Sequence, residues 1–268
     1  MSGYSGSVEA IGHAGEILQG ALNGEAFLVT LPAPGLRSRA IAQRSCGWTI
    51  DPPTKLKALR AARLAASGPY NIRIDSTIPV GRGYGSSTAD CVAAVRSLTN
   101  LDPAQIAKIV HQAEGATDST MYGEQPVVFL PRLGKLLKLL LGVWPHTHVT
   151  VIDLGGGLID TLATPLPTYT HQEHQAFVDL LALLEAGFAS GNLKQISQVA
   201  TASARIHQSH RPHRKWQDAH DALTAAGALG VARAHSGSLV AALSHYALDI
   251  EADYRYELGV PIPCPSSL

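Results

Sequence analysis

The chain has few charged residues, few aromatic residues and little cysteine. Of its 268 residues only 16% are charged and 6% are aromatic, and 21 Lys and Arg balance 21 Asp and Glu. A balanced charge gives no support to binding of nucleic acid or of an anionic membrane. The three cysteines, Cys46, Cys91 and Cys264, are too scattered for a disulfide framework or a zinc-ligand pair. A reduced, cytoplasmic setting is therefore expected.

Signals for secretion and for membrane insertion are also lacking. The first residues, M-S-G-Y-S-G-S, have neither the basic nor the apolar region of a signal peptide. The best candidate for a membrane span, residues 133–144, is too short and contains Lys135 and Lys138. The 46% of hydrophobic residues and the chain length suit one large globular domain or two of modest size.

The richest local signal lies between Thr77 and Leu98, T-I-P-V-G-R-G-Y-G-S-S-T-A-D-C-V-A-A-V-R-S-L. Alternating glycines are followed by two serines and then by apolar residues at helical spacing. A glycine-rich loop that leads into a helix directs unpaired backbone N–H groups at one point, which suits a phosphate. Ser86 and Ser87 can cap the helix and can offer hydroxyls to a phosphate or a metal ion. A flexible turn before a Ser-capped helix is the plainer interpretation of the glycines alone.

The spacing G-x-G-x-G differs from the dinucleotide-binding fingerprint, and no G-K-S or G-K-T of a Walker loop follows. The string from Pro79 to Ala89 instead resembles the signature P-x-x-x-G-x-G-S-S-x-A of the GHMP kinases, which include the galacto-, homoserine, mevalonate and phosphomevalonate kinases. The resemblance implies that the ATP phosphates are bound by Pro79, Gly81, Arg82, Gly83, Tyr84, Gly85, Ser86, Ser87 and Thr88.

A second motif lies near the N-terminus, where residues 8–22 read V-E-A-I-G-H-A-G-E-I-L-Q-G-A-L. We expect a strand, a glycine-bearing loop at residues 12–16, and a second strand toward residues 27–31 that Pro32, Pro34 and Gly35 break. An ordinary turn explains G-H-A-G alone. The segment resembles the first GHMP motif, in the form P-G-T-C-G-E-L-L-Q-G of the L-threonine kinases of cobalamin side-chain synthesis.

The match to that form is incomplete. Ile11 and Ala14 stand in place of its proline and cysteine, and His13 replaces a small residue. Because this loop borders the acceptor pocket in the superfamily, the departures bear on the substrate more than on the reaction type. The resemblance implies an acceptor-side role for His13, Glu16 and Gln19.

Asp102 and Pro103 predict the start of a helix that ends near Glu114 and Gly115, followed by a loop with Asp118. Alone, the two acidic residues are a helix-end glutamate and a turn aspartate. By resemblance Glu114 binds Mg²⁺ together with Ser87, and Asp118 accepts the proton of the acceptor hydroxyl. Homoserine kinases generally lack that aspartate, which argues against homoserine kinase proper.

A third motif lies in residues 226–243, A-G-A-L-G-V-A-R-A-H-S-G-S-L-V-A-A-L, which predict a strand at 230–234 and a tight turn at 235–238. A hairpin turn explains the pattern by itself. By resemblance it is the third GHMP motif, a glycine loop that closes on phosphates and acceptor, which adds Ser236 and Gly237 to the substrate-binding candidates.

Other segments have weaker signals. Helices are expected at 55–66, 169–190 and 192–207, and strands at 71–78, 127–130, 136–141 and 148–154, although the leucine run at 136–141 also suits a helix. Two short strands are expected in 37–50. Residues 155–161 are expected to form a turn near a domain junction. His207, His210 and His213 have a metal-like spacing, but Pro212 and nearby arginines favour a solvated basic surface.

The three motifs occur in the superfamily's order along the whole chain. The resemblance implies an α+β fold with two domains: residues 1–145, of the ribosomal S5 domain 2-like type, and residues 146–268, ferredoxin-like. It implies a kinase that uses ATP and Mg²⁺ to phosphorylate a small hydroxylated acceptor, with L-threonine favoured. It is compatible with a homodimer, without nucleic-acid or membrane partners. Other acceptors, or a non-catalytic nucleotide-binding regulator, stay open.

Overall fold

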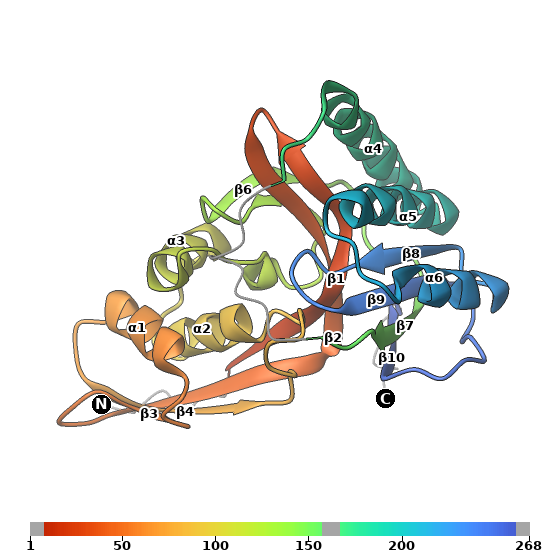
Figure 1. Ribbon diagram of the computed structural model, residues 1–268. Coiled ribbons are helices and arrows are strands. Elements are labelled where there is room, and N and C mark those ends of the chain that lie inside the picture. The colour runs from red at the N-terminus through yellow and green to blue at the C-terminus, as the bar shows by residue number, and fades with distance from the viewer. Residues whose placement is uncertain (1–7, 157–166, 261–268) are drawn as a thin grey trace, which may run out of the picture.

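The computed structural model describes residues 8–156 and 167–260. The cysteine at 264, the glycine at 157 and the Asp160–Thr161 turn expected from the sequence lie outside these ranges. In the described residues one mixed sheet has the strand order β10-β7-β9-β8-β1-β2-β4-β3, and β5 and β6 extend it through a contact between β5 and β2 (Figure 1). The sheet runs through both expected domains, so the division at residue 145 stays a prediction.

Two long antiparallel strands form the centre of the sheet. β1 (Val8–Leu22) and β2 (Glu25–Arg44) are joined by a tight turn, and Figure 1 shows this hairpin between the two groups of helices. The sequence analysis was wrong to place a loop at residues 12–16 and a break at Pro32–Gly35. β2 continues because Pro34 lies in a bulge, where Ile11 pairs with Arg37 and Gly12 with Ala33, and Pro32 lies opposite His13 beside a second register shift. At a bulge the missing proline N–H costs no ladder hydrogen bond.

Helices of the N-terminal half pack together beside β1 and β2. They are α1 (Leu56–Ala65), α2 (Ser86–Arg96) and α3 (Pro103–Glu114), followed by the short 3₁₀ helix η1 (Thr120–Tyr122). The expected start of α3 is confirmed, because Asp102 accepts from the Gln105 N–H and Gln105 bonds back in a capping box. On the same half lie strands β3 (Thr49–Asp51), β4 (Tyr70–Ser76), β5 (Val127–Leu130) and β6 (Lys135–Leu139).

The C-terminal half contributes β7 (Thr147–Asp153), β8 (Gly230–Arg233), β9 (Leu239–Ser244) and β10 (Tyr254–Leu258) to the sheet. Its helices are α4 (His171–Ser190), α5 (Leu193–His210) and α6 (Trp216–Ala225). α4 and α5 pack on β1, and α6 packs on β8 and β9. The expected hairpin at 235–238 is confirmed as the β8–β9 turn, and the leucine run is strand β6.

A continuous apolar core joins the two halves of the chain. Phe27 of β2 meets Phe177 of α4 edge to face, with ring centroids 6.1 Å apart. Gly20 of β1 leaves the space for that ring, because a Cβ there would lie 2.6 Å from it. None of the helices in 8–156 and 167–260 is both long and apolar enough to cross a membrane.

The histidines at 207, 210 and 213 do not form the expected solvated surface. His207 is buried and its ring lies 5.7 Å from that of His235. His210 Nε2 bonds Glu173 Oε1 at 2.7 Å, and His213 Nε2 bonds the Gly155 carbonyl oxygen at 3.1 Å. α5 continues to residue 210 and buries the first of the three, so each imidazole has a different environment.

Candidate functional site

The glycine-rich loop before α2 has the backbone conformation that its sequence predicts. Gly81, Gly83 and Gly85 have φ values of 72°, 95° and 70°, which side-chain-bearing residues rarely adopt. Gly85 is itself the N-cap of α2 and no side chain caps the helix, so the expectation that Ser86 or Ser87 caps it was wrong. The left-handed residue at the N-cap position leaves both serines inside the first turn.

The β8–β9 turn packs directly on this loop. A Cβ at Gly83 would lie 2.7 Å from the Ser236 carbonyl oxygen, and a Cβ at Gly237 would lie 2.5 Å from the Arg82 carbonyl oxygen. Side chains are therefore excluded from both positions. The close approach brings the second and third motifs, about 150 residues apart in the sequence, into backbone contact.

The first motif meets the other two at the same place. A Cβ at Gly15 would lie 2.8 Å from the Ala234 nitrogen, and one at Gly12 would lie 2.9 Å from the Tyr84 carbonyl oxygen. The register of β1 with β2 shifts between Ile11 and Gly12, between His13 and Glu16, and between Glu16 and Leu18. Bulges of this kind turn side chains from one face of a strand to the other. His13 and Glu16, three residues apart, consequently lie on the same side, with His13 Nδ1 3.8 Å from Glu16 Oε1.

A chain of hydrogen bonds links α2, α3 and the loop that follows. Ser87 Oγ and Thr88 Oγ1 donate to the two carboxylate oxygens of Glu114, the second at 2.9 Å. Thr88 Oγ1 also accepts from the Asp118 N–H at 3.4 Å. His13 Nε2 donates to Asp118 Oδ2 at 3.1 Å. The structure thus places Ser87, Glu114 and Asp118 together, beside His13 of β1.

Arg82 lies on the outer side of the loop. Its guanidinium is partly exposed and pairs with Asp153 of β7 at 3.4 Å. Asp153 Oδ1 also accepts from Ser238 Oγ and from the Gly155 N–H. This network connects the loop to the end of β7.

The charges of Asp118 and His13 depend on each other. Burial alone would raise the pKa of Asp118, but the charge of His13 and its hydrogen bond hold that pKa below the usual value. Burial likewise opposes protonation of His13, whose pKa is raised because Asp118 lies beside it. Asp118 is therefore an ionised carboxylate at neutral pH, held by an imidazole N–H.

Glu16 and Glu114 behave in the opposite way. Burial raises the pKa of Glu16 from 4.5 to about 7, against the opposing effects of His13 and the His235 N–H. Burial also raises the pKa of Glu114 to about 7, despite the hydrogen bonds from Ser87 and Thr88. Lys57 Nζ, 4.0 Å away, is a nearby cation. A bound cation at Glu114 would favour the ionised form.

His235 is a site residue that the sequence analysis did not single out. Its backbone N–H donates to the Glu16 carboxylate, and its ring Nδ1 lies 3.1 Å from Gln19 Oε1. Gln19 Nε2 donates to the Arg233 carbonyl oxygen at 2.9 Å, which fixes the side-chain amide. Burial lowers the pKa of His235 to about 4, so the ring is neutral and Nδ1 donates to Gln19. Its place next to Ser236 in the third motif was the available sequence signal.

The other residues that the sequence predicts for the site also lie in this region. Tyr84 is buried under the loop, and Ser86 is buried in the first turn of α2. Pro79 begins the loop, and Ser236 and Gly237 form the β8–β9 turn. All of the motif residues consequently belong to, or directly flank, one region made by β1, the start of α2, the end of α3 and the β8–β9 turn.

Comparisons with known proteins agree with this architecture. Residues 54–128 match the family model for the GHMP kinases N terminal domain. No curated protein sequence matches the chain significantly. Solved structures with a similar fold include homoserine kinase from Cytophaga hutchinsonii, with 17% identity and a TM-score of 0.62, covering 91% of this chain and 87% of that one.

Two further similar structures contain small-molecule ligands. They are L. major mevalonate kinase in complex with R-mevalonate (14% identity, TM-score 0.64, 96% of this chain and 97% of that one) and Streptococcus pneumoniae phosphomevalonate kinase with phosphomevalonate and AMPPNP (14%, 0.66, 94% and 99%). The expected α+β GHMP kinase fold is confirmed.

The raised pKa of Glu16 predicts a specific pH dependence of stability. The pKa of Glu16 is higher in the folded chain than in the unfolded chain, so its protonated form favours the folded state. This contribution to the free energy of unfolding is fully present below pH 4.5 and is lost as the pH rises toward 7. The shift corresponds to a loss on the order of 3 kcal/mol. In Glu16→Gln a neutral amide replaces the ionising carboxyl, so the variant does not lose this contribution. The free energy of unfolding of the variant minus that of the wild type should therefore increase by about 3 kcal/mol between pH 4.5 and 8.

Urea unfolding at several pH values measures this difference. Glu25→Gln, at an exposed glutamate that begins β2, is the matched control and should parallel the wild type. A Glu16→Gln curve parallel to wild type over the same pH range would show that Glu16 does not titrate differently on folding.

Proposed function

We propose that this protein is a small-molecule kinase that transfers the γ-phosphoryl group of ATP to a hydroxyl of a small acceptor, L-threonine or a similar hydroxy amino acid. The observation that carries the proposal is the hydrogen-bonded series Ser87, Glu114, Thr88, Asp118 and His13, next to three glycines of positive φ at a helix N-terminus. Phosphoryl transfer depends mainly on positioning and on charge neutralisation, and this site offers groups for both.

The phosphate groups would lie against the loop at residues 81–85 and the first turn of α2. The helix dipole and the unpaired N–H groups of that turn favour a polyanion. The positive φ of the three glycines shapes the loop that leads into this turn. Arg82 adds positive charge to this side, although Asp153 already pairs with it.

The donor set at Ser87 and Glu114 fits Mg²⁺. Magnesium prefers oxygen ligands, commonly one or two carboxylates together with substrate phosphates. Here a hydroxyl oxygen lies beside the two oxygens of a buried carboxylate, and Lys57 Nζ lies 4.0 Å from Glu114 Oε1. When bound, the ion would supply charge neutralisation on the phosphates.

Asp118 would orient the acceptor hydroxyl and take its proton. Its ionised carboxylate uses Oδ2 for the hydrogen bond from His13, which fixes the plane of the group. His13 is therefore proposed as a positioning residue for Asp118. A polar network next to these two residues would shape the acceptor side of the site. It consists of Glu16, Gln19 and His235, and Ser236 and Gly237 follow His235 in the β8–β9 turn.

The choice of acceptor rests on the motif likeness to the L-threonine kinases, and His13 and Ala14 depart from that form. Homoserine, mevalonate-like alcohols and sugars are alternatives within the same chemistry. A nucleotide-binding regulator on the same scaffold is the alternative from another class. The joint presence of Ser87, Glu114 and Asp118 in one bonded series supports the enzyme, since a regulator has no chemical need for all three.

The first test is ADP release with Mg·ATP and a panel of L-threonine, L-serine, homoserine, mevalonate and simple sugars. We expect acceptor-dependent ADP release, highest with a hydroxy amino acid, and a phosphorylated product by mass spectrometry. ATP binding without ADP release for every acceptor would favour the regulator.

The role of Asp118 predicts that Asp118→Asn lowers kcat by roughly 10²–10⁴-fold, as loss of a general base does. ATP affinity should change little, because the side chain faces the acceptor. Steady-state kinetics and nucleotide binding separate the two effects, with Asp75→Asn at an exposed position of β4 as the matched control. Near-normal turnover in Asp118→Asn would remove Asp118 from the chemistry.

The role of Ser87 predicts that Ser87→Ala weakens Mg·ATP binding by about 10-fold or more, since both a ligand and a hydrogen bond to Glu114 are lost. Ser86→Ala, in the preceding position, should have the smaller effect. Calorimetric titration with Mg·ATP and with ATP in EDTA measures the magnesium-dependent part. A larger effect of Ser86→Ala would assign the metal-ligand role to Ser86.

A further inference from the structure

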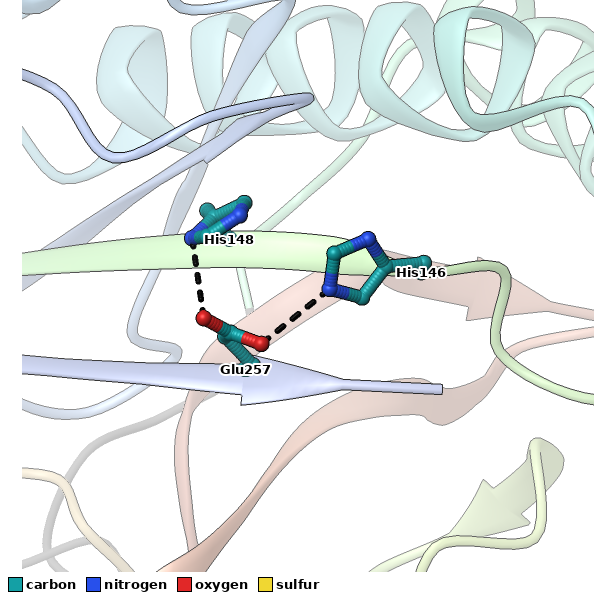
Figure 2. A group of neighbouring side chains, drawn as sticks. All are labelled: His146, His148 and Glu257. Atoms are coloured by element: carbon teal, nitrogen blue, oxygen red, sulfur yellow. Dashed lines mark hydrogen bonds and ion pairs between the residues drawn. The ribbon is translucent and has the colours of Figure 1, made fainter. Parts of the chain in front are cut away.

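A cluster of metal-binding residue types lies on the sheet away from the candidate kinase site. His146, His148 and Glu257 are the one group of at least three His, Cys, Asp or Glu side chains with converging ligand atoms among residues 8–156 and 167–260. Figure 2 shows the imidazoles of His146, just before β7, and of His148, in β7, directed toward the carboxylate of Glu257 in β10. In the sheet, β9 and β8 lie between β7 and β1.

The strand register brings the three side chains together. Glu257 is the direct cross-strand partner of His148 in the antiparallel β7–β10 pair. His146 lies just before β7, two residues ahead of His148, and its Nε2 is 3.1 Å from Glu257 Oε2. His146 immediately before β7, His148 within it and Glu257 opposite it therefore bring three ligand atoms to within 4.8 Å of one another.

The spacing of the ligand atoms suits a tetrahedral ion. His146 Nε2 lies 3.1 Å from Glu257 Oε2, and His148 Nδ1 lies 3.4 Å from Glu257 Oε1. Bonds of about 2.0–2.2 Å to Zn²⁺ at tetrahedral angles separate neighbouring ligand atoms by about 3.3 Å. The available ligand atoms all lie within 4.8 Å of one another. A zinc ion fits with small side-chain rotations.

The charge of the cluster is also suitable. Glu257 brings an exposed carboxylate to two imidazoles, so the cluster offers one oxygen and two nitrogen ligands. Two imidazoles and one carboxylate are borderline ligands that Zn²⁺ accepts, whereas Mg²⁺ and Ca²⁺ prefer sites made of oxygen atoms.

The backbone on both sides of the cluster is held in place. Thr147, between the histidines, is buried, and its Oγ1 donates to the Pro145 carbonyl oxygen at 2.6 Å. Gly259, two residues after Glu257, packs on the Trp144 carbonyl oxygen, which a Cβ would approach to 2.3 Å. The backbone that carries the three ligands is consequently held before an ion arrives and only side-chain rotations remain, which reduces the entropic cost of binding.

We propose that His146, His148 and Glu257 form a surface site for a zinc ion, with a water as the fourth ligand. Coordination by the ion replaces the hydrogen bond between His146 and Glu257 and joins β10 to β7. Because the three ligands are brought together only in the folded chain, binding of the ion stabilises the fold by mass action. The site is separate from the proposed kinase centre and does not rest on that proposal.

The test uses the full chain without a polyhistidine tag, treated with EDTA and dialysed. Titration with Zn²⁺ against a chromophoric chelator should show one equivalent bound. His148→Ala and Glu257→Gln should each weaken this binding by at least about 10-fold, as lost metal ligands do. His171→Ala, an exposed histidine at the start of α4, should bind as wild type does.

Thermal unfolding provides a second readout. At the same concentration, Zn²⁺ should raise Tm in the wild type and in His171→Ala, and should raise it much less in Glu257→Gln. Glu257→Gln changes an exposed side chain without changing its size, so a folding defect is not expected and the circular dichroism spectrum checks this. No zinc binding by the wild type, or binding that both ligand variants retain, would overturn the proposal and leave a plain histidine–glutamate ion pair.

Discussion

The candidate site depends on close backbone contact between three glycine-bearing segments. Gly83 of the phosphate loop and Gly237 of the β8–β9 turn lie against each other's neighbouring carbonyl groups, and Gly15 of β1 lies against Ala234. At these distances a single Cβ would force the segments apart. The contact therefore sets the distance between the helix N-terminus and the buried polar residues of β1, on which every proposed role depends.

Around this contact, buried acidic groups differ in the direction of their pKa shifts. Asp118 is ionised because it pairs with His13, whereas Glu16 and Glu114 are held with raised pKa values because burial outweighs their hydrogen bonds. Groups of one chemical type with different protonation behaviour are frequent where proton transfer and cation binding occur. The proposed function uses this difference, with a cation at Glu114 and an acceptor hydroxyl at Asp118.

His13 gives the site an individual character. His13 stands where the L-threonine kinase form of the motif has a small residue. Its Nε2 bonds Asp118, so His13 is at one end of the series of hydrogen bonds that begins at Ser87. A Cβ at Gly85 would lie 2.4 Å from the His13 ring, so the glycine at the N-cap and the histidine on β1 fit each other. The imidazole occupies space beside Asp118, and in the proposed function it would limit the size of the acceptor.

The sequence by itself determined the local features. The glycine spacing predicted a loop with positive φ before α2, the Asp102–Pro103 pair predicted the start of α3, and the order of the motifs indicated the fold. These features depend on neighbouring residues, so a local pattern contains them. The His-Thr-His pattern at 146–148 was equally visible, but its acidic partner is about 110 residues away.

Only the tertiary structure decided which side chains meet. The bulges in β1 place His13 and Glu16 on one face, against the alternation that a regular strand predicts, and they replaced the expected loop at residues 12–16. Burial of His207 and the entry of His235 into the site likewise depend on the packing of α5 and of the β8–β9 turn. Register shifts and burial arise from contacts between distant segments, and a one-dimensional pattern contains no information on which of two faces such a contact selects.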